Sequence, residues 1–341
     1  PLPRLELGEL YIGEKKQFQA RNAQINFSLS GLFNDKTPIS TIEFQEVKIT
    51  AAHLQNVTTW LQQLANENRY PVTQMMITQG TLDADVFQLS NIEGELNFEP
   101  DGKFAHANLR TNAGKFTMGI KALPEEKLQI YILAHDTILP LLPNWSFDEI
   151  TATGQLSKDE FQISDFDARI LGGALHGSLG LGWRAGWRAQ GTFTAKGIPM
   201  QKLGKLLDGN IDGDAHFQMT SVDLAGLVDS VALQGNFMAN RGMISGMNIF
   251  ETARMRSTSN LPGGRTPFEV LSGVISYTNN TYHFKQVEIT AGVLNATAAF
   301  DVSKQQLSGK MSVSLSMSEG ITPVVLQMGG AINDPTLRYA P

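Results

Sequence analysis

Alternation of apolar and polar residues with a period of two is the main pattern of this 341-residue chain. The clearest run is LSGKMSVSLSMS, residues 307–318, in which Leu307 and Val313 share one face with the other apolar residues, while serine and lysine take the opposite face. Such a run predicts a strand with one dry face and one wet face. Similar runs recur along most of the chain, and together they predict roughly 20 strands arranged as a meander.

Turn signals separate these runs. The segment FDARILGGALHGSLGLGW, residues 166–183, holds two alternating runs that meet at Gly172 and Gly173. Because glycine enters positive φ without steric cost, this step predicts an antiparallel hairpin with a primed turn. We expect further turns at Asp101–Gly102 and at Asn279–Asn280.

Helical periodicity is scarce. The best candidates are residues 53–68 and 197–209, and weaker ones are 136–142 and 247–256. These segments interrupt the strand runs at intervals of roughly 50–80 residues, which indicates a degenerate repeat of several strands followed by a short helix. Since no long linker divides the chain, we expect one repeat-built β domain over residues 1–341.

Composition narrows the classes of partner. Hydrophobic residues make up 42% of the chain and charged residues 18%, so disorder is excluded. The net charge of −6 argues against nucleic acid and against electrostatic docking on anionic lipid. The lack of cysteine excludes disulfides, thiolate nucleophiles and cysteine–zinc sites. The sequence holds no run of about 18 apolar residues, so it predicts no membrane span. Because the chain opens on Pro1 and not on Met, we expect an excised fragment, and an N-terminal anchor outside it stays open.

Motifs that carry chemistry are near misses. The glycines of GLGWRAG, residues 180–186, lack the spacing and the following helix of a dinucleotide loop. Asp208, Asp212 and Asp214 lack the spacing of a calcium loop. The six histidines are scattered singly, and no G-x-S-x-G elbow occurs. We therefore expect no catalytic residues, no metal and no cofactor, and a protein that is not an enzyme.

The many amphipathic strands must bury their apolar faces, and two solutions remain open. A sandwich or barrel closes the faces on one another. Alternatively, one long curved sheet leaves an apolar trough, which is stable in water only when a ligand such as a diacyl lipid fills it. For the second solution we expect the trough to be lined by alternating apolar residues, and the lining candidates are Leu175, Leu179, Leu181, Leu294, Phe300, Met311, Val313, Leu315 and Met317.

The chain from about residue 150 onward resembles the AsmA-like proteins. The segment at 166–183 is similar to a family strand that ends in a Gly-Gly step, and ANRGMISGMNIFETA, residues 239–253, resembles the family's step into a short helix. Residues 266–315 are similar to its closing stretch, with Phe300–Asp301, and MGGAINDPTLRYAP resembles its end. Residues 150–341 match best. Residues 1–149 resemble the family only in their succession of alternating runs and glycines, and we expect them to form additional β-groove repeats.

The resemblance implies a fold and a role. The implied fold is mainly β: an elongated, curved antiparallel β-sheet of β-groove or taco-like repeats with a few short capping helices. The implied place is the periplasm of a Gram-negative bacterium, with the body anchored to the inner membrane by a segment absent from this chain. The implied role is a bridge-like module that binds phospholipid or another acyl lipid and moves it between inner and outer membrane. The alternative is a structural or assembly module that contacts outer-membrane or other envelope proteins without carrying lipid.

Overall fold

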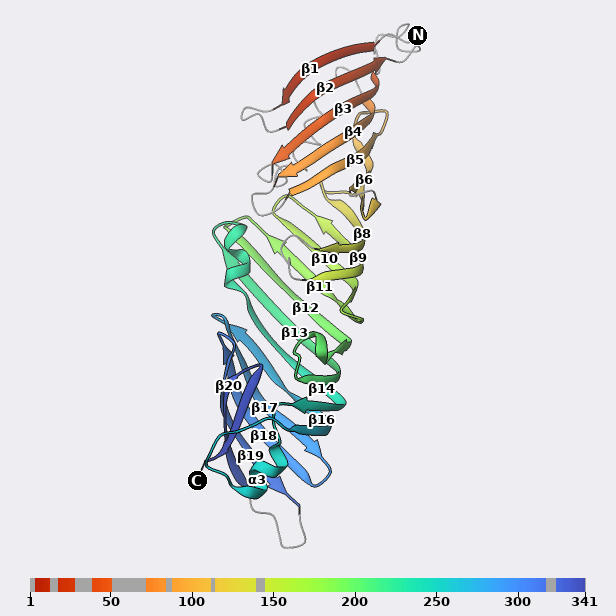
Figure 1. The fold of residues 1–341 in the computed structure, drawn as a ribbon. Helices are drawn as coiled ribbons and strands as arrows, with labels where there is room; N and C mark the ends of the chain where they lie inside the picture. The colour runs from red at the N-terminus through yellow and green to blue at the C-terminus, as the bar shows by residue number, and fades with distance from the viewer. Residues whose placement is uncertain are drawn as a thin grey trace. The chain divides into compact units, whose positions relative to one another are not determined.

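Strands dominate the computed structural model, which describes residues 4–12, 18–27, 39–50, 72–83, 88–111, 114–138, 145–316 and 323–340. Its 21 strands belong to one sheet, and almost every pairing is antiparallel (Figure 1). The prediction of a mainly β chain built on an antiparallel sheet with a few short helices is confirmed. Among the described residues, no helix has the length and apolar character needed to cross a bilayer.

The chain divides into two compact units. Unit 1 comprises Pro1–Ala168, Ser178–Arg188 and Val222–Ala225. Unit 2 comprises Arg169–Gly177, Ala189–Ser221 and Gly226–Pro341. The division passes through three consecutive strands, β10 (Glu160–Ile170), β11 (Gly173–Gly182) and β12 (Trp187–Pro199).

Unit 1 is built on a ladder in which each strand from β1 to β9 pairs with the next. The strands are β1 (Arg4–Ile12), β2 (Phe18–Phe27), β3 (Ile39–Thr50), β4 (Val72–Asp83), β5 (Gln88–Phe98), β6 (Phe104–Thr111), β7 (Phe116–Ala122), β8 (Leu128–Ile138) and β9 (Ser146–Leu156). All of these pairings are antiparallel except the one between β3 and β4, which is parallel. The candidate helix at 53–68 falls between β3 and β4, outside the described residues.

A line of kinks crosses β1, β3 and β4, and the burial spacing of β2 changes along the same line, between Ala20 and Ala23. Glu9, Glu46 and Gln79 have φ values of 49°, 52° and 54°, and each interrupts the alternation of its strand. On β3, Phe44 and Val47 are both buried while the two residues between them are exposed. The side chains of Arg21 and Glu46 form an ion pair across the line, with 3.0 Å between Nη1 and Oε1. The strands therefore keep one apolar face by changing its spacing from two residues to three at the kink.

Unit 2 holds the remaining strands and the described α-helix. They are β13 (Leu207–Ser221), β14 (Ala232–Ser245), β15 (Leu261–Pro262), β16 (Arg265–Thr278), β17 (Thr281–Ala291), β18 (Leu294–Ser303), β19 (Gln306–Leu315), β20 (Val324–Ala331), β21 (Asp334–Tyr339) and α3 (Ile249–Met255). The ladder runs from β13 to β14 and β16, and then in sequence to β21.

The last strand of unit 2 returns toward the start of β16. Strand β21 pairs with β15 through Leu337 and Leu261, and only Gly263 and Gly264 separate β15 from β16. Both glycines have positive φ, 79° and 93°, so the chain turns there without the strain that a side chain would add. The series β16 to β21 is closed in this way, and α3 packs against β16, β19, β20 and β21.

The helical predictions have mixed outcomes. The candidate at 247–256 is confirmed as α3, whose first turn is capped by the Asn248 side chain accepting a hydrogen bond from the Glu251 N–H. The candidate at 197–209 is wrong in extent, because only Met200–Lys202 form a 3-10 helix (η3) between β12 and β13. A second 3-10 helix, η4 (Ala225–Ser230), follows β13. Of the candidate at 136–142, residues 136–138 belong to β8 and the rest lie outside the described residues.

The hairpin prediction is confirmed with its turn moved by one residue. Leu171 and Gly172, with φ values of 56° and 90°, occupy the two central positions, and Gly173 already belongs to β11. Asn279 and Asn280 form the same kind of turn, with φ values of 49° and 58°. Leucine in this conformation is strained relative to glycine or asparagine. For this reason the sequence pattern predicted the turn one residue later, at the glycine pair.

Candidate functional site

The apolar face of unit 1 is organised by strand register into two continuous rows. Each row takes one residue from every strand, and the members face the same side because directly paired residues do so. The first row is Leu7, Ala23, Phe44, Ile77, Gly94, Leu109, Met118, Ile132 and Ala152. The second row is Leu5, Ile25, Ile42, Met75, Leu96, Ala107, Ile120, Ile130 and Gly154. No polar side chain interrupts either row from β1 to β9.

Most large side chains of these rows are only half-buried. Ile77, Leu96, Met118 and Ile132 contact the unit 1 core yet keep part of their surface exposed. Fully buried members such as Phe44 lie among them. Among the residues that the structure describes, unit 1 contributes no α-helix to cover this face. Contiguous apolar surface that stays accessible is common at binding sites, so this stripe is the candidate site of unit 1.

The stripe has the dimensions of hydrocarbon chains. Nine adjacent strands give eight spacings of about 4.8 Å, so each row extends for about 38 Å. One acyl chain of a phospholipid spans half of a bilayer core that is about 30 Å thick. Two such chains therefore fit end to end along one row.

The opposite face of the same strands is polar and internally hydrogen-bonded. The Glu95 carboxylate accepts hydrogen bonds from the side-chain amides of Gln74 and Asn97, at 2.8 and 3.0 Å. These hydrogen bonds, the one from Asn97 foremost, lower the pKa of Glu95 below its ordinary value. On β6 the guanidinium of Arg110 pairs with Glu93. This face is suited to water, so the two faces of unit 1 differ sharply in polarity.

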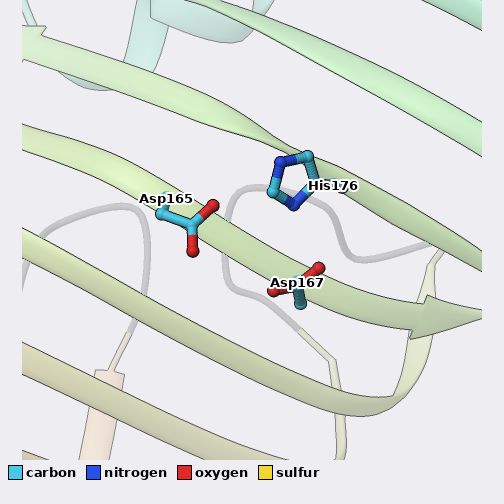
Figure 2. A group of neighbouring side chains, drawn as sticks. All are labelled: Asp165, Asp167 and His176. Carbon is cyan, nitrogen blue, oxygen red and sulfur yellow. The ribbon is translucent and has the colours of Figure 1, made fainter.

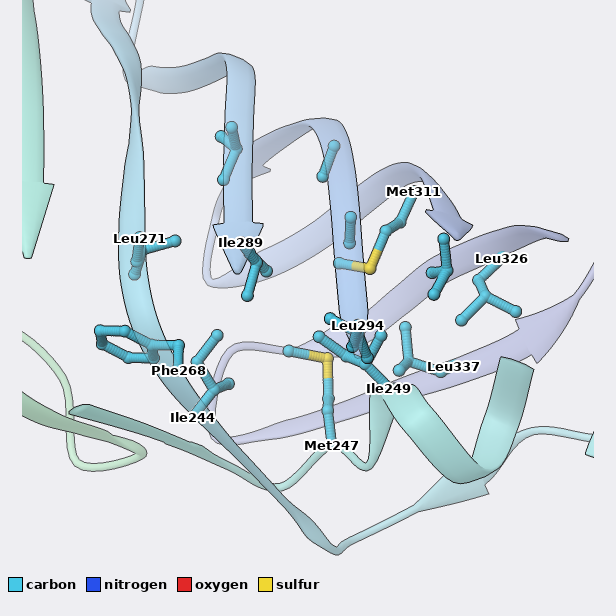
Figure 3. Packing of buried hydrophobic residues seen from close by; sticks show 14 of the residues in the cluster. Ile244, Met247, Ile249, Phe268, Leu271, Ile289, Leu294, Met311, Leu326 and Leu337 are labelled. Atoms are coloured by element: carbon cyan, nitrogen blue, oxygen red, sulfur yellow. The ribbon is translucent and has the colours of Figure 1, made fainter. Parts of the chain in front are cut away.

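Unit 2 has equivalent apolar rows, but they are sealed. The third row is Ile211, Ala239, Leu271, Ile289, Ala296, Val313 and Val324, and all but Ile211 are buried. The fourth row is Val287, Ala298, Met311 and Leu326, all buried. Figure 3 shows Ile249 of α3 beside Leu294 and Leu337, in the same cluster as these rows.

The predicted lining residues fall into three environments. Leu294, Met311 and Val313 are buried in the unit 2 core, and Phe300 and Leu315 are half-buried against it. Leu175, Leu179 and Leu181 on β11 are half-buried. Met317 lies outside the described residues. The sequence therefore identified residues of apolar faces. It did not identify the nine-strand rows of unit 1, because the spacing of apolar residues changes from two to three at the kinks.

Side chains of the types that bind metal ions lie together on an exposed face. Asp165 and Asp167 lie on β10 and His176 on β11 (Figure 2), and the atoms that could bind a metal lie within 4.8 Å of one another. Sequence reasoning missed this group because it treated the histidines singly; a two-residue turn at 171–172 puts position 176 opposite position 167. All three side chains are exposed, and acidic groups often gather this way without an ion, so we assign no metal site.

A second overlooked group lies on the wet face of unit 2. His283 Nδ1 lies 2.7 Å from Asp301 Oδ1, and Ser276 is the ladder partner of His283 on the other side. An acyl-transfer site also needs a substrate cavity and oxyanion donors. Two depressions on the described surface are lined by other residues, one of them by Asn240, Arg241 and Glu269, and neither gives this series a catalytic assignment.

The aspartates near residue 210 have structural partners. Asp212 accepts a hydrogen bond from the Gly197 N–H at 2.7 Å and lies 3.4 Å from the Lys196 ammonium. The hydrogen bond from Gly197 is the main cause that lowers the pKa of Asp212, and Lys196 lowers it further. Asp208 accepts from the side chain of Gln201, and Asp214 from that of Asn236. Each carboxylate therefore points to a different neighbour.

Comparison with known proteins leaves the site to be judged on its own geometry. Neither protein-family models, nor curated proteins, nor solved structures give a match to this chain.

Proposed function

We propose that this chain is a lipid-binding module in which acyl chains lie along the apolar rows of unit 1. The observation that carries the proposal is the continuity of the first and second rows over nine strands while their large side chains stay half-exposed. Transfer of hydrocarbon from water contributes about 0.8 kcal/mol per methylene, so one long acyl chain gains on the order of 10 kcal/mol. The mechanism is passive: chains occupy the rows and headgroups stay in water.

The proposed biological role follows from the resemblance of residues 150–341 to AsmA-like proteins. In that role the chain is a periplasmic part of a bridge for phospholipid between the inner and outer membranes of a Gram-negative bacterium. An anchor to the inner membrane outside this chain, and envelope proteins at the outer membrane, belong to the same proposal. The negative net charge supports a hydrophobic mode of lipid contact over an electrostatic one.

Adjacent residues of β8 provide a matched test. Ile132 belongs to the first row, whereas Leu133 points to the polar face with 38% of its surface exposed. We expect Ile132→Glu to abolish most uptake of a fluorescent phospholipid by the purified protein, because a carboxylate within a bound hydrocarbon layer is strongly disfavoured. Leu133→Glu adds the same charge one residue away and should leave uptake unchanged.

Native mass spectrometry of the unmodified protein supplies the second readout. Bound phospholipid should appear as discrete mass additions that organic extraction removes. A protein that stays at its apo mass after incubation with phospholipid vesicles, or equal uptake by the two variants, would contradict the proposed function.

The sealed rows of unit 2 favour a second candidate, a structural or assembly module of the cell envelope. In that case the apolar faces serve only folding, and the polar faces contact envelope proteins. Loss of fold in the Ile132→Glu variant, together with an unmodified protein that stays at its apo mass after incubation with lipid, would favour this candidate.

A further inference from the structure

The two units differ in what fills their apolar faces, and α3 is the element that makes the difference in unit 2. Ile249 and Ala253 of α3 have exposed fractions of 0% and 1%, and Met247, directly before the helix, is 7% exposed. All three belong to the same cluster as Leu271, Val313 and the other row residues (Figure 3). The helix thus supplies the hydrocarbon that covers this end of the sheet.

We propose that α3 is an internal plug that excludes acyl chains from unit 2, so that lipid is held by the rows of unit 1 alone. This inference rests on the proposed function of the unit 1 rows. It limits the site to β1–β9, and it assigns Leu294, Met311 and Val313 to a closed core that no lipid reaches.

Hydrogen bonds latch the plug to β16. The hydroxyl of Thr266, a residue only 3% exposed, donates to the Met247 carbonyl at 2.8 Å and accepts from the Ile249 N–H at 3.0 Å. The Thr252 hydroxyl, also buried, donates to the Asn248 carbonyl at 2.8 Å. The bond from the Ile249 N–H satisfies a donor that a helix start otherwise leaves unpaired, and the Thr252 hydroxyl is a second donor to the Asn248 carbonyl beside the Thr252 N–H.

The backbone around the plug is shaped to fit it. A Cβ on Gly264 would lie 2.6 Å from the Cβ of Asn248, and Gly264 has a positive φ of 93°. Gly246, with φ of 84°, would place a Cβ 3.2 Å from the Pro335 ring. Only glycine at these positions lets the chain leave β14, form α3 and return to β16 at so short a distance. The plug is therefore part of the folded unit.

Photocrosslinking on the full chain tests the inference. Vesicles of phosphatidylcholine with a diazirine in the acyl chain are incubated with the protein, irradiated, and the adducts are mapped by peptide mass spectrometry. We expect adducts on peptides of β4–β9, which carry Ile77, Met118 and Ile132, and none on peptides of β16–β20. Adducts in both units would overturn this inference alone. No adducts anywhere would overturn the proposed function and this inference together.

Loosening the latch supplies the positive test. Thr266→Ala removes a buried hydroxyl that satisfies two backbone groups, and we expect the yield of adducts in β16–β20 to rise about tenfold while the yield in β4–β9 stays constant. Thr278→Ala, at the exposed end of the same strand, is the matched control and should change neither yield. Should Thr266→Ala fail to fold, the milder Asn248→Ala, which removes only the helix cap, carries the test. A folded latch variant with no new adducts in unit 2 would refute the plug.

Discussion

The rows of unit 1 and unit 2 are alike in residue type and differ in burial. Both consist mainly of aliphatic side chains with small residues between them, aligned strand by strand. In unit 1 residues such as Met118 and Ile132 stay half-exposed, whereas in unit 2 Val313 and Leu326 have exposed fractions of 0%. A helix, a two-residue strand and two glycines close unit 2. An apolar row therefore defines a face, and a few residues outside the row decide whether it becomes a core or an open surface.

A charge placed within a row should give the largest difference in stability between the two units. Val313→Glu puts a carboxylate into the sealed core without any partner, and we expect it to cost more than about 3 kcal/mol and to unfold unit 2. Ile132→Glu in unit 1 lets the carboxylate reach water and should cost about 1–2 kcal/mol. Urea denaturation measures the free energy of unfolding of each variant, and hydrogen exchange in the absence of urea shows which unit is destabilised. Equal destabilisation by the two variants would mean that the rows are equally closed.

Adding a methyl group tests the same difference with a smaller effect. A Cβ on Gly242 in unit 2 would collide with the backbone carbonyl of Asp208 and with the ring of Phe268. A Cβ on Gly94 in unit 1 would meet only the end of the Leu109 side chain, which is able to rotate away. We expect Gly242→Ala to lower the free energy of unfolding by about 2 kcal/mol and Gly94→Ala by less than about 1 kcal/mol. Thermal denaturation of the paired variants is the measurement, and a reversed order would show that unit 1 is the more tightly packed.

Much of the fold follows from the sequence because period-two alternation and turn residues are local signals. The strands at 294–303 and 306–315 alternate without interruption, and the Asn279–Asn280 turn has the residues that its positive φ values favour. The kinks at Glu46 and Gln79 carry a weaker signal, two polar residues between apolar ones, which interrupts the expected period. The predicted helix at 197–209 was wrong in extent because a short apolar stripe near Met200 fits either a helix or the end of a strand.

The candidate site was less predictable than the fold. Register between consecutive strands decides that Ile77, Gly94 and Leu109 stand in one row, and the register shifts around Gly80 displace it from the register that plain alternation predicts. Likewise, Val313 and Ile132 are both aliphatic residues within strands, and nothing in the local sequence marks one as sealed and the other as partly exposed. Only the placement of α3 and the pairing of β15 with β21 distinguish them, and both depend on contacts between segments distant along the chain.

The smallest expected effect concerns one carboxylate in each unit. Glu95 in unit 1 and Asp212 in unit 2 both have a lowered pKa, caused mainly by hydrogen bonds from Asn97 and from the Gly197 N–H, respectively. A carboxyl whose pKa is lower in the folded state stabilises the fold above its unfolded pKa, and that contribution is lost as the pH falls through the folded value. Stability should therefore decline below the ordinary pKa values of 4.5 for Glu95 and 3.8 for Asp212.

Asp212→Asn should flatten the acid side of the stability curve more than Glu95→Gln does, because Asp212 also holds Gly197 at a positive φ of 63°. Denaturant titrations between about pH 3 and pH 7 measure this, and identical curves for Asp212→Asn and the unmodified protein would show that ionisation of Asp212 adds no pH-dependent stability.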